Sequence, residues 1–480
     1  MRNNFYLANE KCNKYKYVNK VFNLFLNHDY ANEYIEVIQS NNKTLVLIGD
    51  FVNAKKPTNT LEENAEELFK SDNLQKLLEY SRFYAGRFLV FYGKNNKLDY
   101  IITDPVVSIP VNYTFDSNNI LISSHAKIIA NELNIAESEE SIKINNGAEQ
   151  QQPLPYDITM YDEIKTLIPN HYLDVKTKKA QRFFPIERLE SMSLDEAAGK
   201  TISCSKKILE GYKKTRKISL PITSGIDSRA VLALMRDYIE DIELYTYELK
   251  GFTNETGDIA IPKKISKYIG TNYHILPVLE VPSDLRNDIH TELAGLENDD
   301  ILNHGYTYSQ SILNDRYSVP GDIISIAKSP FGKDLPESFA TLSYLLTKTH
   351  NYSAENKYHV NRWMEDTVSF AEKYNVSNFD LFNFEYRLGR WLPKSIQNYD
   401  YFIDQVYIFN CRYLIELWLS VPREERTKRS LHIEIIKKEW PELLEFEINP
   451  DDKIIDKLTS NSFVFYIGSH VKYVINKYKK

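Results

Sequence analysis

Residues 218–237 read as a strand, a short polar turn and a helix, and this unit constrains the fold more than any other stretch of the chain. Apolar residues alternate over 218–222 as in a short strand, residues 223–228 form a small polar turn, and residues 229–237 have the apolar spacing of a helix. Gly225 permits a close backbone approach, and the N–H groups at the start of a helix attract anions. The sequence therefore predicts a phosphate-binding turn.

The turn differs from the loop of kinases and GTPases, because no lysine follows its glycine as the G-x-x-x-x-G-K-[ST] pattern requires. It contains Asp227 instead, and carboxylate oxygen is a preferred ligand of the Mg²⁺ that accompanies phosphates. An ordinary βα turn, capped by Asp227 or Ser228, stays open as the alternative. Pro221 also argues against a regular central strand.

The turn resembles the S-G-G-x-D-S pyrophosphate-binding loop of the ATP pyrophosphatases, and its residues are Thr223, Ser224, Gly225, Ile226, Asp227 and Ser228. Arg229, which follows, resembles the asparagine synthetase branch of that family. The resemblance implies that these seven residues bind ATP and that Asp227 is catalytic and binds Mg²⁺. Ser224 replaces the first glycine of the family loop.

Composition and charge limit the classes of protein and partner. The chain has 480 residues, 42% of them apolar, which is enough for two to four domains with sizeable cores. A net charge of −7 argues against nucleic acid as the main partner. The three cysteines have no zinc-site spacing and favour a reducing compartment. No signal or spanning segment is evident, so we expect a cytoplasmic protein with no membrane partner.

Short alternating strands over residues 5–184, with two helices among them, predict an α+β domain with a two-layer β core. Its sequence resembles the Ntn-hydrolase-like glutamine amidotransferase domain of asparagine synthetases. The matching pieces are Gly86-Arg87-Phe88, Thr103-Asp104 and the segments 109–113, 123–127, 161–165 and 168–172. We assign residues 1–187 to this domain.

A glutamine-hydrolysing enzyme of this kind uses an N-terminal cysteine whose own amine is the general base. Position 2 of this sequence is Arg2, and Cys12 is internal. We therefore expect the amidotransferase fold without glutaminase activity.

A Glu-rich connector leads to a capping box at Ser193, where the second domain, residues 188–480, begins. Strands at 242–249 and 273–278 flank a helix over 256–269 that Gly270 ends. This order predicts a doubly wound parallel sheet with ligands at the carboxyl ends of its strands. It resembles the adenine nucleotide alpha hydrolase-like domain of asparagine synthetases, and the resemblance implies that Asp258 contacts the cofactor.

The rest of the chain is expected to be helical, for example over 379–392 and 407–419. Glu385 and Arg387 are interpreted as a structural pair rather than as site residues. The family's G-x-G-x-D-E loop is similar only to residues 319–322, so the resemblance implies a catalytic, metal-binding Asp322, although a plain Pro-Gly-Asp turn is the alternative. Lys453 is a weak match to the family's late catalytic lysine.

The sequence thus predicts an ATP- and Mg²⁺-dependent ligase that adenylates a carboxylate and forms an amide without its own glutaminase. The substrates are a small-molecule or peptide carboxylate and an amine or ammonia, and a homodimer is left open. Ammonia-dependent asparagine synthesis is one alternative. A binding or regulatory relative that has lost turnover is the other, because Ser224 replaces a glycine and the D-E loop is incomplete.

Overall fold

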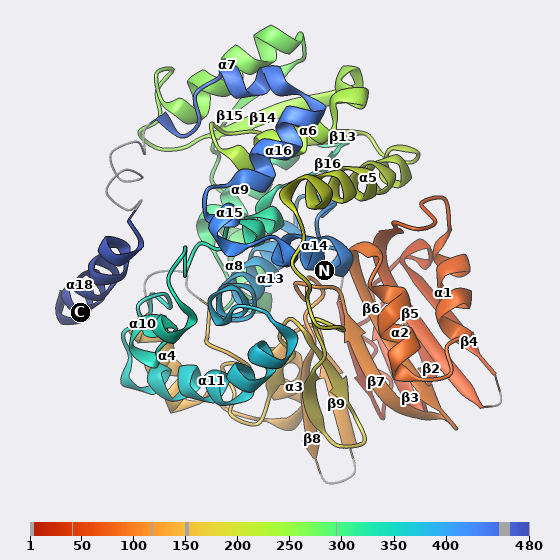
Figure 1. Cartoon of the computed structure of the whole chain (residues 1–480). Helices are drawn as coiled ribbons and strands as arrows, with labels where there is room; N and C mark the ends of the chain where they lie inside the picture. The colour runs from red at the N-terminus through yellow and green to blue at the C-terminus, as the bar shows by residue number, and fades with distance from the viewer. Residues whose placement is uncertain are drawn as a thin grey trace.

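The computed structural model describes residues 4–40, 42–116, 119–148, 153–293, 295–450 and 461–479. Two antiparallel sheets make up the first half of the chain, a parallel sheet opens the second half, and helices form most of the remainder (Figure 1). This arrangement confirms the predicted fold class. No helix among the described residues is both long and apolar enough to cross a membrane.

The first half contains two six-stranded antiparallel sheets, with the strand orders β10-β8-β9-β1-β3-β2 and β12-β11-β7-β6-β5-β4. Their strands are β1 (Phe5–Ala8), β2 (Tyr17–Val21), β3 (Leu24–His28), β4 (Ile35–Gln39), β5 (Lys43–Asn53), β6 (Tyr84–Lys94), β7 (Lys97–Thr103), β8 (Asn112–Asp116), β9 (Asn119–Ser123), β10 (Lys165–Thr166), β11 (His171–Asp174) and β12 (Lys179–Arg182). The helices of this half are η1 (Asn32–Tyr34), α1 (Leu61–Phe69), α2 (Leu74–Ser81), α3 (Ala126–Leu133) and α4 (Glu139–Gly147).

Alternation along the strands explains how the layers pack. Leu7 of the first sheet and Val46 and Phe91 of the second belong to one buried cluster, so the two sheets pack face to face. Leu45 and Leu47 point to the opposite face of the second sheet and join the cluster that contains α1 and α2. The second sheet is therefore covered on both faces.

The second half opens with α5 (Leu194–Lys213), and the hydroxyl of Ser193 accepts a hydrogen bond from the N–H of Glu196, which is the Ser193 half of the predicted capping box. A four-stranded sheet of order β15-β14-β13-β16 follows, and all its pairings are parallel. Its elements are β13 (Ile218–Pro221), α6 (Ile226–Leu234), η2 (Arg236–Asp241), β14 (Ile242–Glu248), α7 (Gly257–Ile269), β15 (Tyr273–Pro277) and β16 (Tyr317–Ser318). Pro221 is tolerated because it is the last residue of its strand.

The remaining elements are mainly helical. They are α8 (Ser283–Leu293), α9 (Asp299–Ser309), η3 (Asp322–Lys328), η4 (Glu337–Phe339), α10 (Leu342–Leu346), α11 (Ala354–Tyr374), α12 (Asn378–Leu381), the π-helix η5 (Phe382–Leu388), α13 (Gly389–Tyr399), α14 (Arg412–Ser420), α15 (Arg423–Thr427), α16 (Ser430–Glu439), η6 (Pro441–Glu445) and α18 (Ser462–Lys479). The helix predicted over 407–419 begins only at Arg412. Residues 407–411 form a turn instead, in which the N–H of Asn410 donates to the carbonyl of Tyr407 at 3.0 Å. Just before this turn, the N–H of Val406 donates to the carbonyl of Ser318 at 2.9 Å.

One buried core runs through both halves, since residues of β5, β6, α5, α6 and α14 belong to the same cluster. The boundary predicted between residues 187 and 188 lies in the connection from β12 to α5 and stays a prediction.

The side-chain amide of Asn410 links the two halves by hydrogen bonds. It donates to Asp104 Oδ1 and to the carbonyl of Gly86, both at 2.7 Å, and accepts from the N–H of Val106 at 3.2 Å.

We predict that Asn410→Ala lowers the free energy of unfolding by about 2–4 kcal/mol, because buried groups of the first half (the Gly86 carbonyl, Asp104 and the Val106 N–H) lose their hydrogen bonds to the second half. Chemical denaturation measures the change. Asn361→Ala, at an exposed position of α11, is the control and should change the stability by less than about 0.5 kcal/mol. Equal effects of the two substitutions would contradict the role given to Asn410.

Candidate nucleotide site at the carboxyl edge of the parallel sheet

Three acidic residues follow three neighbouring strands of the parallel sheet. Asp227 lies in the first turn of α6 after β13, Asp258 in the first turn of α7 after β14, and Asp322 at the start of η3 after β16. The carboxyl ends of parallel strands meet at one edge of the sheet, where ligands of such sheets bind. The topology thus brings together three residues that are far apart in the sequence.

The turn between β13 and α6 is held by its own hydrogen bonds. The N–H of Thr223 donates to the hydroxyl of Ser228 at 3.2 Å, and the N–H of Gly225 donates to the hydroxyl of Thr223 at 3.1 Å. Gly225 is the N-cap residue of α6, and its φ of −71° is open to any residue. The backbone angle therefore does not require glycine, although a Cβ there would lie only 3.1 Å from the hydroxyl of Thr223.

Ser224 is bound to Asp258. Both its N–H and its hydroxyl donate to Asp258 Oδ1, at 2.8 and 2.7 Å. Asp258 thus contacts the predicted loop. Its carboxylate, however, accepts the backbone N–H of Ser224, which would have to bind a phosphate oxygen if the loop binds phosphate. The hydroxyl of Ser224 is buried and points to this carboxylate.

Asp227 lies between two basic side chains. Its Oδ2 accepts a hydrogen bond from Lys328 Nζ at 2.6 Å, and its Oδ1 lies 3.1 Å from Nε2 of His432, which is fully buried on α16. Burial alone would raise the pKa of Asp227, but His432 and then Lys328 outweigh that effect and lower the pKa to about 2. Asp227 is ionised at neutral pH, as a metal ligand requires.

Asp322 has the opposite electrostatic character. Burial, and next the charge of Asp227, raise the pKa of Asp322 to about 6. Gly321 brings this loop against α6, since a Cβ at Gly321 would lie 3.4 Å from the carbonyl oxygen of Asp227. The two carboxyl groups are therefore close enough to disfavour a second negative charge, which is the setting in which a divalent cation binds.

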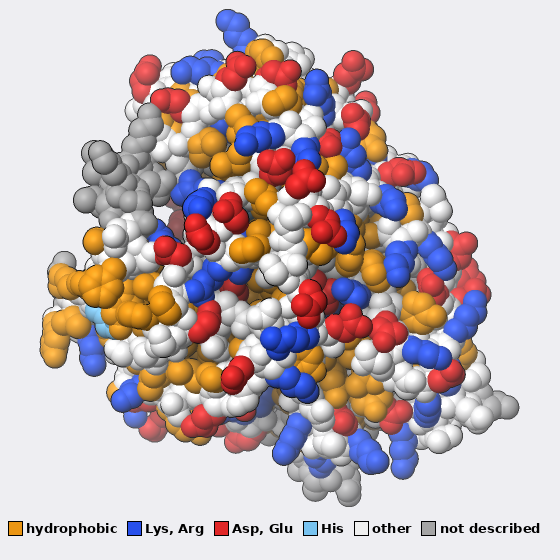
Figure 2. Space-filling view, viewed as in Figure 1, with side chains coloured by type: hydrophobic (Ala, Val, Ile, Leu, Met, Phe, Trp, Pro, Cys, Tyr) orange, Lys and Arg blue, Asp and Glu red, His pale blue; other side chains and the backbone are white. Residues whose placement is uncertain are grey.

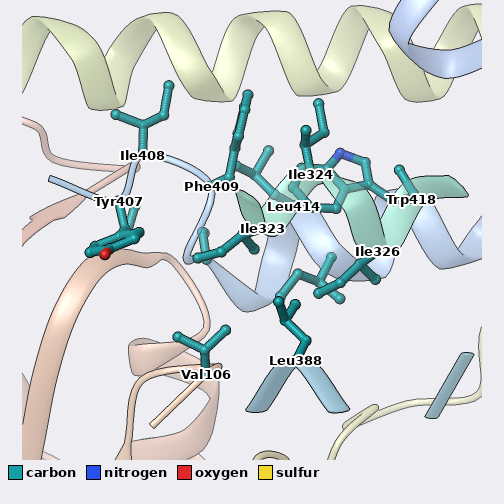
Figure 3. Close-up of a cluster of buried hydrophobic side chains, with 14 of the residues drawn as sticks. Val106, Ile323, Ile324, Ile326, Leu388, Tyr407, Ile408, Phe409, Leu414 and Trp418 are labelled. Atoms are coloured by element: carbon teal, nitrogen blue, oxygen red, sulfur yellow. The ribbon is translucent and has the colours of Figure 1, made fainter. Parts of the chain in front are cut away.

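The residues after Asp322 belong to the core. Ile323, Ile324 and Ile326 are buried, and Figure 3 shows them packed with Phe409, Leu414 and Trp418. Ile323 stands where the family loop has its glutamate and cannot bind a metal. Its packing, however, anchors η3, and η3 carries both Asp322 and Lys328.

Arg229 holds the chain that borders the turn. Its fully buried guanidinium donates to the carbonyls of Ser224, Leu443, Phe446 and Glu447 at 2.7 to 3.2 Å. The N–H of Asn449 also donates to the carbonyl of Ser224 at 3.3 Å. These contacts place Arg229 behind the turn as a support. Lys453 lies outside the described residues.

Sequence reasoning missed Lys328 and His432. Lys328 follows an apolar run and His432 lies within an amphipathic helix, so neither position carries a motif. The roles predicted for residues 223–229, Asp258 and Asp322 stay predictions. Within the described ranges, no group of three or more His, Cys, Asp or Glu side chains could hold a metal ion by itself.

Glu385 is structural. It is fully buried on η5, accepts hydrogen bonds from Asn170 and from Trp363 Nε1 at 2.8 Å, and forms an ion pair with Arg182. The ion pair with Arg182 of β12 was not expected from the sequence. Glu385 therefore connects the first half to the helical part and lies outside the candidate site.

Comparisons with known proteins do not assign a family. No family model and no curated protein matches the chain. Solved structures that match include the allosteric regulatory enzyme of purine biosynthesis (12% identity, TM-score 0.24, 58% of this chain and 76% of that one). The glutamine phosphoribosylpyrophosphate amidotransferase of B. subtilis (11%, 0.23) aligns over 55% of this chain and 56% of its own, and the NH3-dependent NAD synthetase of Campylobacter jejuni (13%, 0.20) over 40% and 81%. At these TM-scores the fold class rests on the sheet topology described above.

We predict that Asp322→Asn raises the stability at pH 8 by about 1–2 kcal/mol and has little effect at pH 4. The carboxyl group has a pKa of about 6 in the folded chain against an ordinary 3.8, so ionisation destabilises the fold increasingly as the pH rises from about 4 to 6. Urea denaturation at both pH values measures this. Exposed Asp334→Asn is the control, and an effect of Asp322→Asn that is independent of pH would contradict the assignment.

Proposed function

We propose that this chain is an ATP- and Mg²⁺-dependent ligase of the asparagine synthetase type, which adenylates a carboxylate and forms an amide. The observation that carries the proposal is the convergence of Asp227, Asp258 and Asp322 with the helix N-terminus of α6 at the carboxyl edge of a parallel sheet. Helix N-termini and such edges favour phosphate groups.

The acidic pair fits Mg²⁺ bound together with a nucleotide. Mg²⁺ is commonly held by one or two carboxylates plus phosphate oxygens and water, and Asp227 and Asp322 supply two carboxylates. Lys328 Nζ donates a hydrogen bond to Asp227 Oδ2 at 2.6 Å, and this bond must break when a cation binds to that oxygen. The released ammonium would remain at the site, where it can pair with phosphate.

The turn fits phosphate only after one change. Asp258 accepts the N–H of Ser224, and a phosphate oxygen needs the same donor. Two anions at one N–H repel each other, so nucleotide binding requires the side chain of Asp258 to turn away. We infer that Asp258 opposes nucleotide binding in this conformation.

Bound ATP would supply an adenylyl group that makes a carboxylate carbon reactive toward nitrogen. The residues of this chain would hold the phosphates, keep Asp227 ionised beside His432 and balance the charge that develops on pyrophosphate through Lys328. The nitrogen comes from free ammonia or from an amine of the substrate. Ammonia-dependent asparagine synthesis is the narrower form of the same proposal.

A nucleotide-binding or regulatory protein without turnover is the second candidate. It is favoured by the ion pair of Lys328 with Asp227 and by the bond from Ser224 to Asp258, because both contacts use groups that catalysis needs. Nucleotide binding without pyrophosphate release would distinguish this function from a ligase.

We predict that the chain releases pyrophosphate from ATP with Mg²⁺ and a mixture of carboxylic acids and amines, and that Asp227→Ala abolishes the release. Loss of one carboxylate from a metal–phosphate site removes several kcal/mol of charge compensation, on the order of a thousandfold in rate. Asp237→Ala, at an acid just beyond α6 that pairs with Lys206, is the matched control. Normal release by a folded Asp227→Ala protein would refute the site.

We predict that Asp258→Asn binds Mg²⁺–ATP several-fold more tightly than the wild type. The substitution keeps an acceptor for Ser224 but removes the negative charge that competes with phosphate. Equilibrium titration with ATP measures the affinity, and Asp300→Asn, at an acid of α9, is the control. Weaker binding by Asp258→Asn would instead make Asp258 part of the nucleotide site, as the sequence resemblance implies.

A further inference from the structure

The helix α18 (Ser462–Lys479) packs against the protein with one face only. On this face Tyr466 stacks on Tyr344 of α10, with ring centroids 4.8 Å apart, and Ser469 accepts a hydrogen bond from Lys348 Nζ at 2.7 Å. Asn476, two turns later, donates to the hydroxyl of Tyr352 at 3.1 Å. The helix lies at the side of the molecule, with its far end away from the sheets (Figure 1).

The opposite face of α18 is apolar and exposed. At 3.6 residues per turn, the apolar residues that are not packed fall on one continuous stripe opposite Tyr466 and Ser469. Their exposed fractions run from 47% to 84%, and they are Phe463, Val464, Ile467, Val471, Val474, Ile475 and Tyr478. Figure 2 shows the resulting hydrophobic patch over α18. A stripe of this size on a helix that is already packed needs a partner.

Basic residues border this stripe, and acidic residues are absent from it. Residues 461–480 contain four lysines and no Asp or Glu, although the whole chain has a net charge of −7. By the same helical spacing, Lys472 flanks one side of the stripe and Lys477 the other. Long lysine side chains in such positions can cover apolar surface and keep their charge in the polar layer.

A second group of cations lies at the packed face of α18, on the side away from the stripe. Lys348 is buried against the ring of Phe465, and Lys333, Arg387 and Lys472 lie near it. Burial first, and then repulsion from these three cations, lower the pKa of Lys348 to about 7.

We propose that α18 binds in the plane of a membrane surface that contains anionic lipids. Its apolar stripe would enter the boundary between head groups and acyl chains, and Lys472 and Lys477 would contact the lipid phosphates on either side. The helix is about 27 Å long and is not apolar enough to span, so it would lie on the bilayer. This proposal replaces the sequence-based expectation that the chain has no membrane partner.

Charge favours a lipid surface over a second copy of the chain. Pairing two α18 stripes would place lysines against lysines, because the helix offers no carboxylate to either flank. Anionic head groups supply the missing charge on both flanks at once. The proposal is independent of the nucleotide site, since α18 packs on α10 and contributes no residue to that edge of the sheet.

Vesicle co-sedimentation of the full chain tests the proposal. The wild type should pellet with vesicles of phosphatidylcholine and phosphatidylglycerol and stay in the supernatant with phosphatidylcholine alone. Ile467→Glu should lower the partition coefficient at least tenfold, and replacing Lys472 or Lys477 by Gln should lower it about fivefold each, with a weaker salt dependence. Ile312→Glu, at an isoleucine that is 75% exposed elsewhere, is the matched control and should leave binding unchanged.

Three results would overturn the proposal: no pelleting of the wild type with anionic vesicles, equal pelleting with neutral vesicles, and equal loss in Ile312→Glu and Ile467→Glu. Light scattering of the same proteins tests whether a second copy of the chain binds to the stripe. A wild-type dimer that Ile467→Glu converts to a monomer, without vesicle binding, would assign the stripe to a second copy. Because Ile467 is half-exposed, the melting temperature should not change, which separates lost binding from lost folding.

Discussion

The buried guanidinium of Arg229 fixes the geometry on which the candidate site depends. Burial lowers the pKa of Arg229 to about 10, and its partners are four backbone carbonyls. Loss of these carbonyl contacts would leave a buried charge without partners, so they hold the segment around 443–447 against the first turn of α6. The carbonyl of Ser224 is one of the four, which ties the turn itself to this support.

At the site that Arg229 supports, acidic side chains are paired with a lysine and with donors of the turn. Lys328 forms an ion pair with Asp227, and Asp258 accepts the backbone N–H of Ser224. The groups that a metal and a phosphate would need are therefore already paired with other groups of the protein. This pairing offsets the charges that Asp227 and Asp258 bring to one edge of the sheet. It also makes ligand binding an exchange of partners at preformed positions.

Much of the fold could be predicted from the sequence because its signals are local. The N-cap at Ser193, the strand over 44–52 and the glycine that ends α7 each depend on neighbouring residues, and the structure agrees with them. The predicted start of α14 was wrong because residues 407–411 form a turn, from which Asn410 makes tertiary hydrogen bonds to Gly86 and Asp104. Lys328, His432 and the bond from Ser224 to Asp258 were out of reach for the same reason, since each joins segments that only the folded sheet brings together.

The most direct test of the central claim is a crystal structure of the chain with Mg²⁺ and an ATP analogue that cannot be cleaved. We predict that the phosphates lie over the turn at 223–228, that Mg²⁺ binds Asp227 and Asp322, and that Lys328 Nζ has left Asp227 Oδ2. Asp258 should no longer accept the N–H of Ser224. A nucleotide bound elsewhere, or a turn that keeps the contacts of Lys328 and Asp258 beside bound nucleotide, would contradict the claim that this chain is organised around an ATP site.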